Sequence, residues 1–453
     1  MFERRLLLKT CGMVPLLPYA SGAIFRGQDL EPHFFLHIHV MGGVDTSYFF
    51  DARPRVFTAK GKIQNYHPGD REPQRWVDQE GRSCLVAPAG QQLADFRGDV
   101  TILNGVHMNL SFDGHGQNLN DLVTGSPFGG EYFLPYFRRG SGHSLEFVTM
   151  GDVFIDITNG GGSLALTPDG AKSMVALATS LGHQGASGMP IVLNRLEDLG
   201  GRSDDDGLSL GARSMKRGIQ HSDEIIQRFR RLRLEIDPDP VLTQCRLVGQ
   251  IFSRKLASGI FWPIYGDIDV HDTGSAQLQP VTYDAIGTQL AGIFRFLKTT
   301  PFDGERSFLD VTTVMIGSEF SRTMRQLGNP VEATGTDHNS LANSLILGGK
   351  GVKGNQILGA TDLAKMDRSG KILDASSIHH SLDPHLIKAM GKPFDFETGR
   401  SRIEPSVDYQ RSNYLTMESV ANTVYEVLNL PSEFPRRRNG GDTAPVIPQV
   451  FSS

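Results

Sequence analysis

The sequence predicts an α/β protein with a largely parallel central sheet. Two apolar runs, residues 34–40 and 311–316, have the length and the β-branched or aromatic composition of buried strands. Between them, residues 283–297 form an amphipathic helix that leads through a Pro/Gly turn into the second strand. A helix that connects buried strands is typical of a sheet whose strands run parallel.

Other segments extend this pattern. Further strands are predicted at 99–103, 145–149 and 345–347, and further helices at 221–235, 240–258 and 416–428. We expect one α/β domain over residues 31–430, with long loop insertions over about 150–260. A flexible tail, rich in Pro, Arg and Gly, is expected over 431–453.

The composition is that of a globular protein. The chain has 453 residues, is 39% hydrophobic and 21% charged, and carries a net charge of −5 with mixed signs. This charge balance gives no indication of nucleic acid as a partner. The three cysteines, Cys11, Cys84 and Cys245, form no CxxC pair, so a thiolate zinc site is not expected. Cys84 and Cys245 are interpreted as buried free thiols, with a disulfide between them as the alternative in an exported protein.

The first residues resemble a twin-arginine export signal. Arg4 and Arg5 are followed by three leucines and Lys9, and then by a weakly apolar stretch. We therefore expect residues 1–30 to be read by the twin-arginine export machinery and the mature protein to be periplasmic or secreted. The alternative is a plain basic helix. No run of about 18 apolar residues occurs elsewhere, so no membrane span is expected in the mature protein.

Polar residues follow the first predicted strand. Residues 42–47 read Gly-Gly-Val-Asp-Thr-Ser, so Asp45 and Thr46 come just past the carboxyl end of that strand. His37 and His39 are two residues apart within the strand and share one face. The pair could bind a metal, although inside an apolar strand such histidines are more often packed and hydrogen-bonded.

A second polar group follows the strand at 311–316. Glu319 and Arg322 come directly after it, and a polar loop then delivers Asp337 and His338 side by side. Because an α/β sheet collects its ligands outside the carboxyl ends of its strands, we expect these side chains at one rim. A Gly-rich corner at 104–118 contributes His115 as a further functional candidate.

A third group is the turn that contains Asp267, Asp269 and His271. Carboxylates and imidazoles from three separate segments suit a shared divalent metal. Zinc and manganese accept mixed Asp and His ligands, and calcium is the alternative for an oxygen-rich set. Structural hydrogen bonds between histidine and carboxylate are the competing interpretation of each pair.

The order of these motifs resembles a bacterial family of exported proteins, the domain of unknown function 1501 family. The most specific motifs are SEFSR at 318–322 and GTDH at 335–338, supported by GGVD at 42–45 and DVH at 269–271. The resemblance covers most of the mature chain and is thin over 150–260. That family is grouped with the alkaline-phosphatase-like superfamily of metal-dependent phosphatases, sulfatases and phosphomutases.

The resemblance implies a fold and a set of site residues. The fold would be a three-layer α/β/α sandwich, alkaline-phosphatase-like, with long loop insertions. The metal ligands would be Asp45, Asp267 or Asp269 with His271, and Asp337 with His338, and a third histidine would be His379, His380 or His385. Glu319 would be a further ligand or a base, and Arg322 would hold a tetrahedral anion. Thr46 is a candidate nucleophile, with Ser47 and Ser111 as alternatives.

The implied function is that of an exported, metal-dependent hydrolase of phosphate or sulfate esters, acting on a small-molecule or polymeric substrate. The sequence departs from the superfamily at two points. No Ser or Thr nucleophile stands out, and no cysteine lies in the C-x-P-x-R pattern of sulfatases. The alternative is therefore a non-catalytic binding or structural protein that keeps the fold.

Overall fold

The computed structural model describes most of the expected α/β domain. It covers residues 31–52, 71–108, 236–271, 278–323, 338–365, 387–402 and 411–452, with gaps of a few residues. Shorter described stretches occur within 56–64, 115–166, 227–233 and 325–336.

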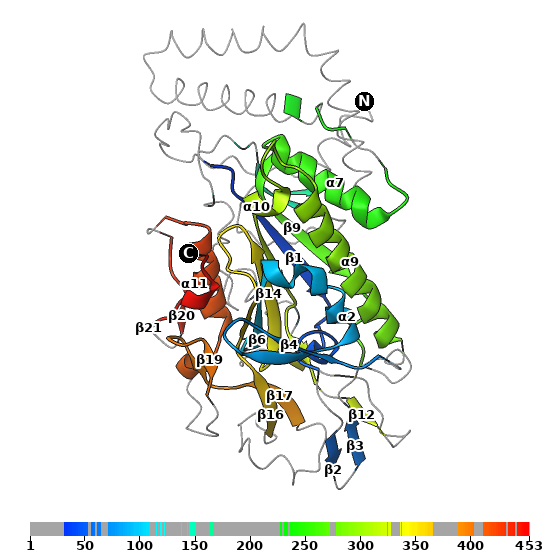
Figure 1. Cartoon of the computed structure of the whole chain (residues 1–453), viewed down its shortest axis with the longest axis vertical. Helices are drawn as coiled ribbons and strands as arrows, with labels where there is room; N and C mark the ends of the chain where they lie inside the picture. The colour runs from blue at the N-terminus through cyan, green and yellow to red at the C-terminus, as the bar shows by residue number, and fades with distance from the viewer. Residues whose placement is uncertain are drawn as a thin grey trace, which may run out of the picture.

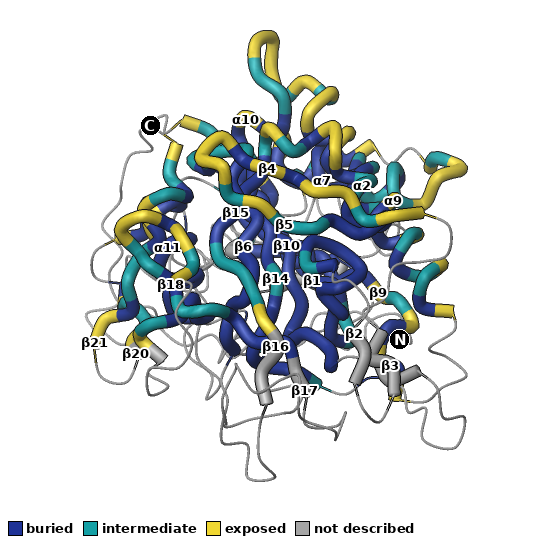
Figure 2. The backbone as a smooth tube through the Cα atoms, turned by 60° about the horizontal axis from the view of Figure 1, so that its bottom comes forward, coloured by how far each residue is buried: buried dark blue, intermediate teal, exposed yellow. Residues whose placement is uncertain are grey.

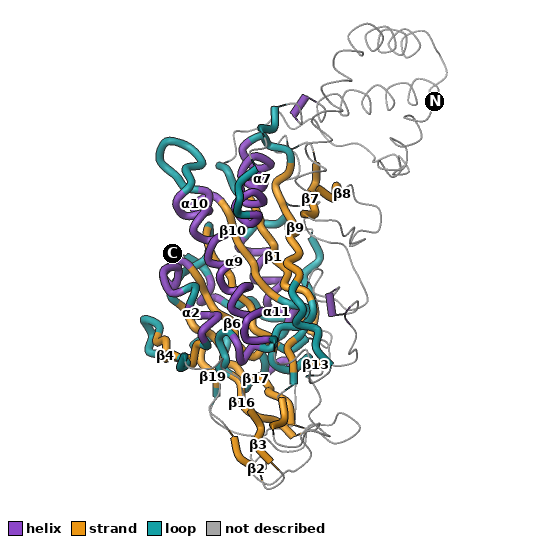
Figure 3. The backbone as a smooth tube through the Cα atoms, turned by 90° about the vertical axis from the view of Figure 1, so that its right-hand side faces the viewer, coloured by secondary structure: helices purple, strands orange, loops and turns teal. Residues whose placement is uncertain are grey.

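The centre of the molecule is a sheet of eight strands in the order β15-β6-β14-β10-β1-β9-β7-β8. Their bounds are β1 (Phe34–Met41), β6 (Val100–Val106), β7 (Leu145–Met150), β8 (Ser163–Leu166), β9 (Ala257–Tyr265), β10 (Thr312–Gly317), β14 (Asn343–Gly349) and β15 (Gln356–Leu358). Of these eight strands, β14 runs antiparallel to both of its neighbours, and every other pairing is parallel. Figure 3 shows β1, β9 and β10 running side by side along the molecule. The mostly parallel sheet predicted from the sequence is confirmed.

Helices cover both faces of this sheet (Figure 1). The helices α2 (Pro88–Gln91), α7 (Pro240–Ser253), α9 (Gln279–Thr299) and α10 (Phe308–Val311) pack on one face, and α11 (Met417–Val427) packs on the other. Along β1, Leu36 and Ile38 join the hydrophobic cluster of the first group, whereas Phe35 joins that of α11. Side chains alternate across a strand in this way. The result is the three-layer α/β/α sandwich, and Figure 2 shows its central strands as the buried part of the chain.

Smaller elements surround the sandwich. One three-stranded sheet contains β2 (Val56–Thr58), β3 (Gly61–Gln64) and β12 (Arg325–Leu327). The other small sheets have two strands each: β4 (Gln74–Val77) with β5 (Ser83–Val86), β11 (Ser321–Arg322) with β13 (His338–Asn339), β16 (Thr361–Lys365) with β17 (Ile387–Gly391), β18 (Phe394–Asp395) with β19 (Arg400–Ser401), and β20 (Arg438–Asn439) with β21 (Asp442–Thr443). Short 3₁₀ helices lie at η1 (Thr46–Tyr48), η2 (Ala94–Asp99), η5 (Arg411–Asn413) and η6 (Pro448–Val450).

The central strand β9 is an element that the hydrophobic pattern did not reveal. It pairs with β1 on one side and β7 on the other, yet it contains Pro263, and a proline counts against a central strand. The helix expected over 240–258 ends at Ser253, and Lys255 has a positive φ of 53° before β9 begins. Residues 240–260 are therefore part of the core and not of a loop insertion.

Two other expectations differ from the structure. The run at 311–316 divides between α10 and β10, because Ser307 and Asp310 form a capping box that starts a short helix ahead of the strand. In the described part of 431–453, Phe434, Ile447 and Val450 are buried in the same cluster as α11, in contrast to the flexible tail that was expected.

Some expectations lie outside the described residues, namely the export signal at 1–30 and most of the helix at 221–235. Cys84 and Cys245 are free thiols, as expected. Burial raises the pKa of each to about 12. None of the described helices combines the length and the apolarity that a membrane crossing requires.

Candidate metal centre

The polar site lies where β1 and β9 end. After β1 the backbone turns through Gly42 and Gly43, which have φ of 109° and 76°. An added Cβ at Gly43 would lie 2.1 Å from the ring of Phe320, so no larger residue fits this turn. The short pair β11–β13 then sets Arg322 opposite His338 in register.

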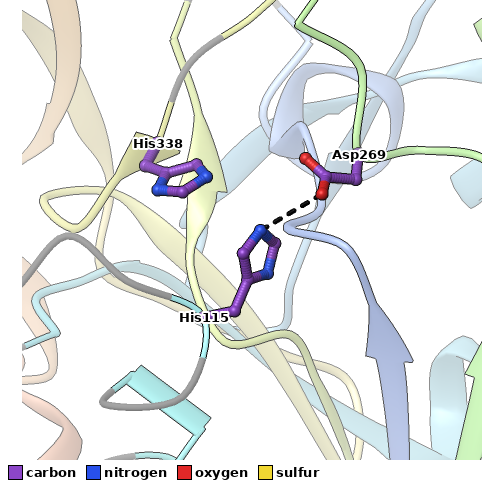
Figure 4. Close-up of side chains that lie close together, drawn as sticks. All are labelled: His115, Asp269 and His338. Carbon is purple, nitrogen blue, oxygen red and sulfur yellow. Dashed lines mark ion pairs between the residues drawn. The ribbon is translucent and has the colours of Figure 1, made fainter.

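Three side chains converge there into a group able to hold a metal ion. His115, Asp269 and His338 each offer one ligand atom, and these atoms all lie within 4.8 Å of one another. Figure 4 shows the two imidazoles and the carboxylate pointing into the same space from three different segments. The Nε2 atom of His115 lies 3.2 Å from Oδ2 of Asp269. Two imidazoles and one carboxylate form a donor set that zinc and manganese accept.

Glu319 lies behind this group and is almost completely buried. It accepts hydrogen bonds from the Gly42 amide at 2.8 Å, the Ser318 hydroxyl at 2.9 Å and His115 Nδ1 at 2.7 Å, and His39 Nε2 lies 3.1 Å away. Burial acts to raise the pKa of Glu319, but the imidazoles of His115 and His39 hold that pKa well below its usual range. The carboxylate is therefore ionised.

Glu319 also fixes the orientation of His115. Its hydrogen bond raises the pKa of His115, with burial acting in the opposite direction. Because Nδ1 of His115 is engaged with Glu319, the ring presents Nε2 toward Asp269. A carboxylate that orients a histidine in this way is the usual support of a metal-ligating imidazole.

Arg322 supports the same site from its buried side. Its side chain is fully buried. Its Nε donates to the carbonyl oxygens of Gly42 and Gly43 at 3.1 and 3.3 Å, and its Nη2 donates to Asp269 and to Gly42. The predicted role of Arg322 as the clamp of a tetrahedral anion does not fit this arrangement, because the guanidinium is committed to protein acceptors away from solvent.

The ion pair with Arg322 also determines the charge of Asp269. Burial acts to raise the pKa of Asp269, but the hydrogen bond and the charge of Arg322 lower it below its ordinary value. His271 lies next to this pair, with Nε2 at 3.0 Å from Oδ1 of Asp269 and 3.4 Å from Nη1 of Arg322. His271 is half exposed, so it lies at the mouth of the site.

The other predicted site residues lie elsewhere or outside the description. Asp45 caps η1 by accepting hydrogen bonds from the amide and hydroxyl of Ser47, and burial raises its pKa to about 6. Thr46 is buried, with its hydroxyl oxygen 3.4 Å from that of Ser321. Asp267 is exposed, and among the described residues neither it nor Asp45 belongs to the metal-capable group. Asp337, Ser111, His379, His380 and His385 lie outside the described residues.

The structure brings together two of the predicted metal ligands and adds one histidine to them. Asp269 and His338 meet as the motifs indicated, while His115, considered only as a general candidate, completes the group. His39 contacts Glu319 and not a metal position. His37 is fully buried against Phe261, and burial, with the charge of His39, lowers its pKa well below its ordinary value. The two strand histidines are thus packed, which was the competing interpretation of the pair.

A cavity of about 380 Å³ opens onto this site. His39, His115, Asp269 and Glu319 contribute to its wall. Its volume is in the range of about 300–1,000 Å³ that is usual for small-molecule sites.

The fold and the site together define an α/β sandwich protein with an imidazole–carboxylate group at the carboxyl edge of its sheet. Residues 269–401 match the family model described as "Protein of unknown function (DUF1501)", the family that the sequence motifs resemble. Among curated proteins no match to the chain was found.

Among solved structures, the lipoteichoic acid synthase LtaP from Listeria monocytogenes is similar at 7% identity, with a TM-score of 0.32. The match covers 73% of this chain and 68% of that one. A likeness of this size carries no argument about the activity of this chain.

Proposed function

We propose that the protein is an exported, metal-dependent hydrolase of phosphate or sulfate esters. The observation that supports this proposal is the convergence of His115, Asp269 and His338, whose ligand atoms lie within 4.8 Å of one another. These residues come from three separate segments of the chain, and two of them, His115 and Asp269, line a cavity. Such a convergence at the carboxyl edge of a parallel sheet is the usual position of a catalytic site.

The donor set fits a transition metal. With metal–ligand bonds of about 2.0–2.2 Å, neighbouring ligand atoms lie roughly 3.0–3.5 Å apart. The 3.2 Å between His115 Nε2 and Asp269 Oδ2 agrees with that spacing, and the group as a whole, which lies within 4.8 Å, would contract around a bound ion. Three protein ligands leave a fourth position for water or substrate, as catalytic zinc sites do. Two imidazoles favour zinc over calcium.

The surrounding residues have separate tasks in this proposal. A bound divalent ion would supply a Lewis acid and a means of activating water. Glu319 orients His115, and Arg322 orients Asp269 while compensating its negative charge. His271, half exposed beside Asp269, can hold or move a proton at the mouth of the site.

One observation favours the alternative, a non-catalytic binding or structural protein. Asp269 already accepts from Arg322, and each of its oxygens lies near an imidazole, so the group is also a satisfied hydrogen-bond network. In that case the network would stabilise the carboxyl edge of the sheet without an ion.

Metal analysis of the purified protein separates these two functions. We expect about one zinc or manganese per chain, lost in Asp269→Asn and in His338→Ala, together with hydrolysis of phosphate or sulfate monoesters that the same substitutions abolish. Asp267→Ala is the matched control, because this exposed carboxylate lies two residues from Asp269 but outside the group, and it should retain the metal. A metal-free protein that Asp269→Asn and His338→Ala destabilise, while Asp267→Ala does not, would support the structural alternative.

Export is a separate part of the proposal and has a separate test. The paired Arg4 and Arg5 of the leader match a twin-arginine signal. Replacing both with lysine should retain the protein in the cytoplasm of a bacterial host, whereas the unchanged leader should deliver it to the periplasm. If both forms were found in the same cellular fraction, this export route would be excluded.

A further inference from the structure

The cavity at the metal centre has a second wall of different chemistry. Met41, Leu119 and Tyr265 line it together with the carboxylates and imidazoles described above. No Lys or Arg occurs among the described residues that line it. One side of the cavity is therefore ionic, and the other side is apolar and aromatic.

The two walls arise from the same elements. On β1, His39 and Met41 are two residues apart and point to the same face of the sheet. Met41 is paired in register with Tyr265 at the end of β9, so these two side chains are neighbours at the carboxyl edge. His115 and Leu119 lie four residues apart in the sequence, and both line the cavity.

Exposure to solvent increases from His39 through Met41 to Tyr265. His39 is completely buried, Met41 is partly exposed, and Tyr265 is 53% exposed. His39 and Glu319 thus form a buried base of the cavity, and Tyr265 lies at its mouth together with His115 and Asp269, whose side chains are 40% and 46% exposed. A half-exposed tyrosine ring beside a methionine and a leucine offers an apolar contact surface to whatever enters.

We propose that the ester held at this site carries an apolar alcohol, such as an aryl or alkyl group, which packs against Met41, Leu119 and Tyr265. This inference rests on the proposed function, because it requires the charged end of the ester to lie at the ionic wall. A sugar or a polyol would leave hydroxyl groups against apolar side chains, and groups buried without partners are unfavourable. The chemistry of the cavity therefore selects the alcohol part of the substrate, while the metal group recognises the acid part.

The test compares two esters whose leaving groups are both alkoxides. Benzyl phosphate and glycerol phosphate, and the corresponding sulfates, are offered to the metal-loaded protein. We expect a roughly tenfold higher kcat/KM for the benzyl ester, because filling an apolar pocket distinguishes substrates by about that factor. Tyr265→Ala should reduce this ratio toward one. Ile236→Ala, which removes an exposed apolar side chain that does not line the cavity, should leave the ratio unchanged.

A binding measurement keeps the inference testable if no ester is hydrolysed. Calorimetric titration with benzylphosphonate and with 2-hydroxyethylphosphonate compares an aryl group with a hydroxylated group on phosphonates, whose P–C bond is not hydrolysed. Tighter binding of benzylphosphonate, lost in Tyr265→Ala, supports the inference even where the proposed hydrolysis fails. Equal affinity for the two phosphonates, or hydrolysis without preference for the benzyl ester, overturns the inference and leaves the proposed hydrolase intact. Absence of binding to either phosphonate overturns it as well.

Discussion

Arg322 and Asp269 form an ion pair in which the guanidinium is fully buried while the carboxylate side chain is 46% exposed. The remaining donors of the guanidinium face backbone carbonyl oxygens of Gly42 and Gly43 and the imidazole of His271. Asp269 is thereby held by a cation that solvent does not reach. The pair links β11 to the turn after β9, and the bonds of Arg322 to Gly42 and Gly43 connect the turn after β1 as well. It also positions the only carboxylate of the described metal-capable group.

This relationship predicts the effect of Arg322→Lys. Lysine keeps the charge but lacks the planar fork, so the bonds to the two glycine carbonyls cannot all be remade. We expect the free energy of unfolding to fall by about 2–4 kcal/mol, because buried acceptors lose their donors. Urea denaturation measures this change. In Arg306→Lys, where the pair with Asp303 is exposed to solvent, the free energy of unfolding should hardly change. Equal effects of the two substitutions would contradict the buried role of Arg322.

Glu319→Gln tests whether this carboxylate supports a metal ligand. Glutamine has nearly the same shape and can still accept the bond from the Gly42 amide, but it lacks the charge that orients His115. We expect the metal affinity to fall about 10–100-fold, as is usual when a carboxylate partner of a ligating histidine is removed. Competition with a chelator measures the affinity, and circular dichroism checks that the fold is retained. An unchanged affinity in a folded variant would show that His115 needs no such partner or binds no metal.

The sequence predicted the sheet better than it predicted the site. Strands such as β1 and β10 are buried on both faces and therefore appear as continuous apolar runs, and α9 has a clear helical period. In β9, by contrast, Pro263 obscured a strand that tertiary pairing stabilises. Propensity is local, whereas the position of β9 between β1 and β7 depends on contacts distant in sequence.

The site depends on such distant contacts even more strongly. Asp269 and His338 follow sheet strands and could be expected at one rim, but His115 lies in a helical segment whose position the motif spacing does not give. Arg322 was expected to face a ligand. Its side chain instead turns inward because the carbonyl oxygens of Gly42 and Gly43, and the carboxylate of Asp269, need donors there. Residue types therefore indicated the chemistry of the site, and packing decided which residue performs which task.

The turn after β1 predicts a large effect for Gly43→Ala. Gly43 and Gly81 have nearly the same φ, 76° and 75°, but an added Cβ meets Phe320 at 2.1 Å in the first case and nothing within 4 Å in the second. Gly81→Ala should therefore lower the free energy of unfolding by about 1–2 kcal/mol, from the positive φ alone. Gly43→Ala should lower it by roughly 3 kcal/mol or more, since the clash with the aromatic ring is added. The difference between the two urea transitions isolates the steric effect, and equal transitions would mean that Phe320 moves aside freely.

The last prediction concerns acid stability and Asp78. This carboxylate is buried in the turn between β4 and β5, where it accepts from the amides of Glu80, Arg82 and Ile357 and from the Arg82 guanidinium. Burial acts to raise its pKa, but these bonds lower it below the ordinary value of 3.8. Because the unfolded chain binds the proton more readily, the stabilisation from Asp78 is present above that value and is lost as the pH falls through the folded-state pKa. Asp78→Asn should thus lower the free energy of unfolding by about 2 kcal/mol at pH 7. Below pH 4, urea titrations should show a smaller difference in the free energy of unfolding between Asp78→Asn and the unchanged protein. Asp95 is exposed, so Asp95→Asn should leave the free energy of unfolding unchanged at both pH values. If the difference for Asp78→Asn stayed constant down to pH 3, the charge of Asp78 would contribute nothing to the contact between the β4–β5 hairpin and β15.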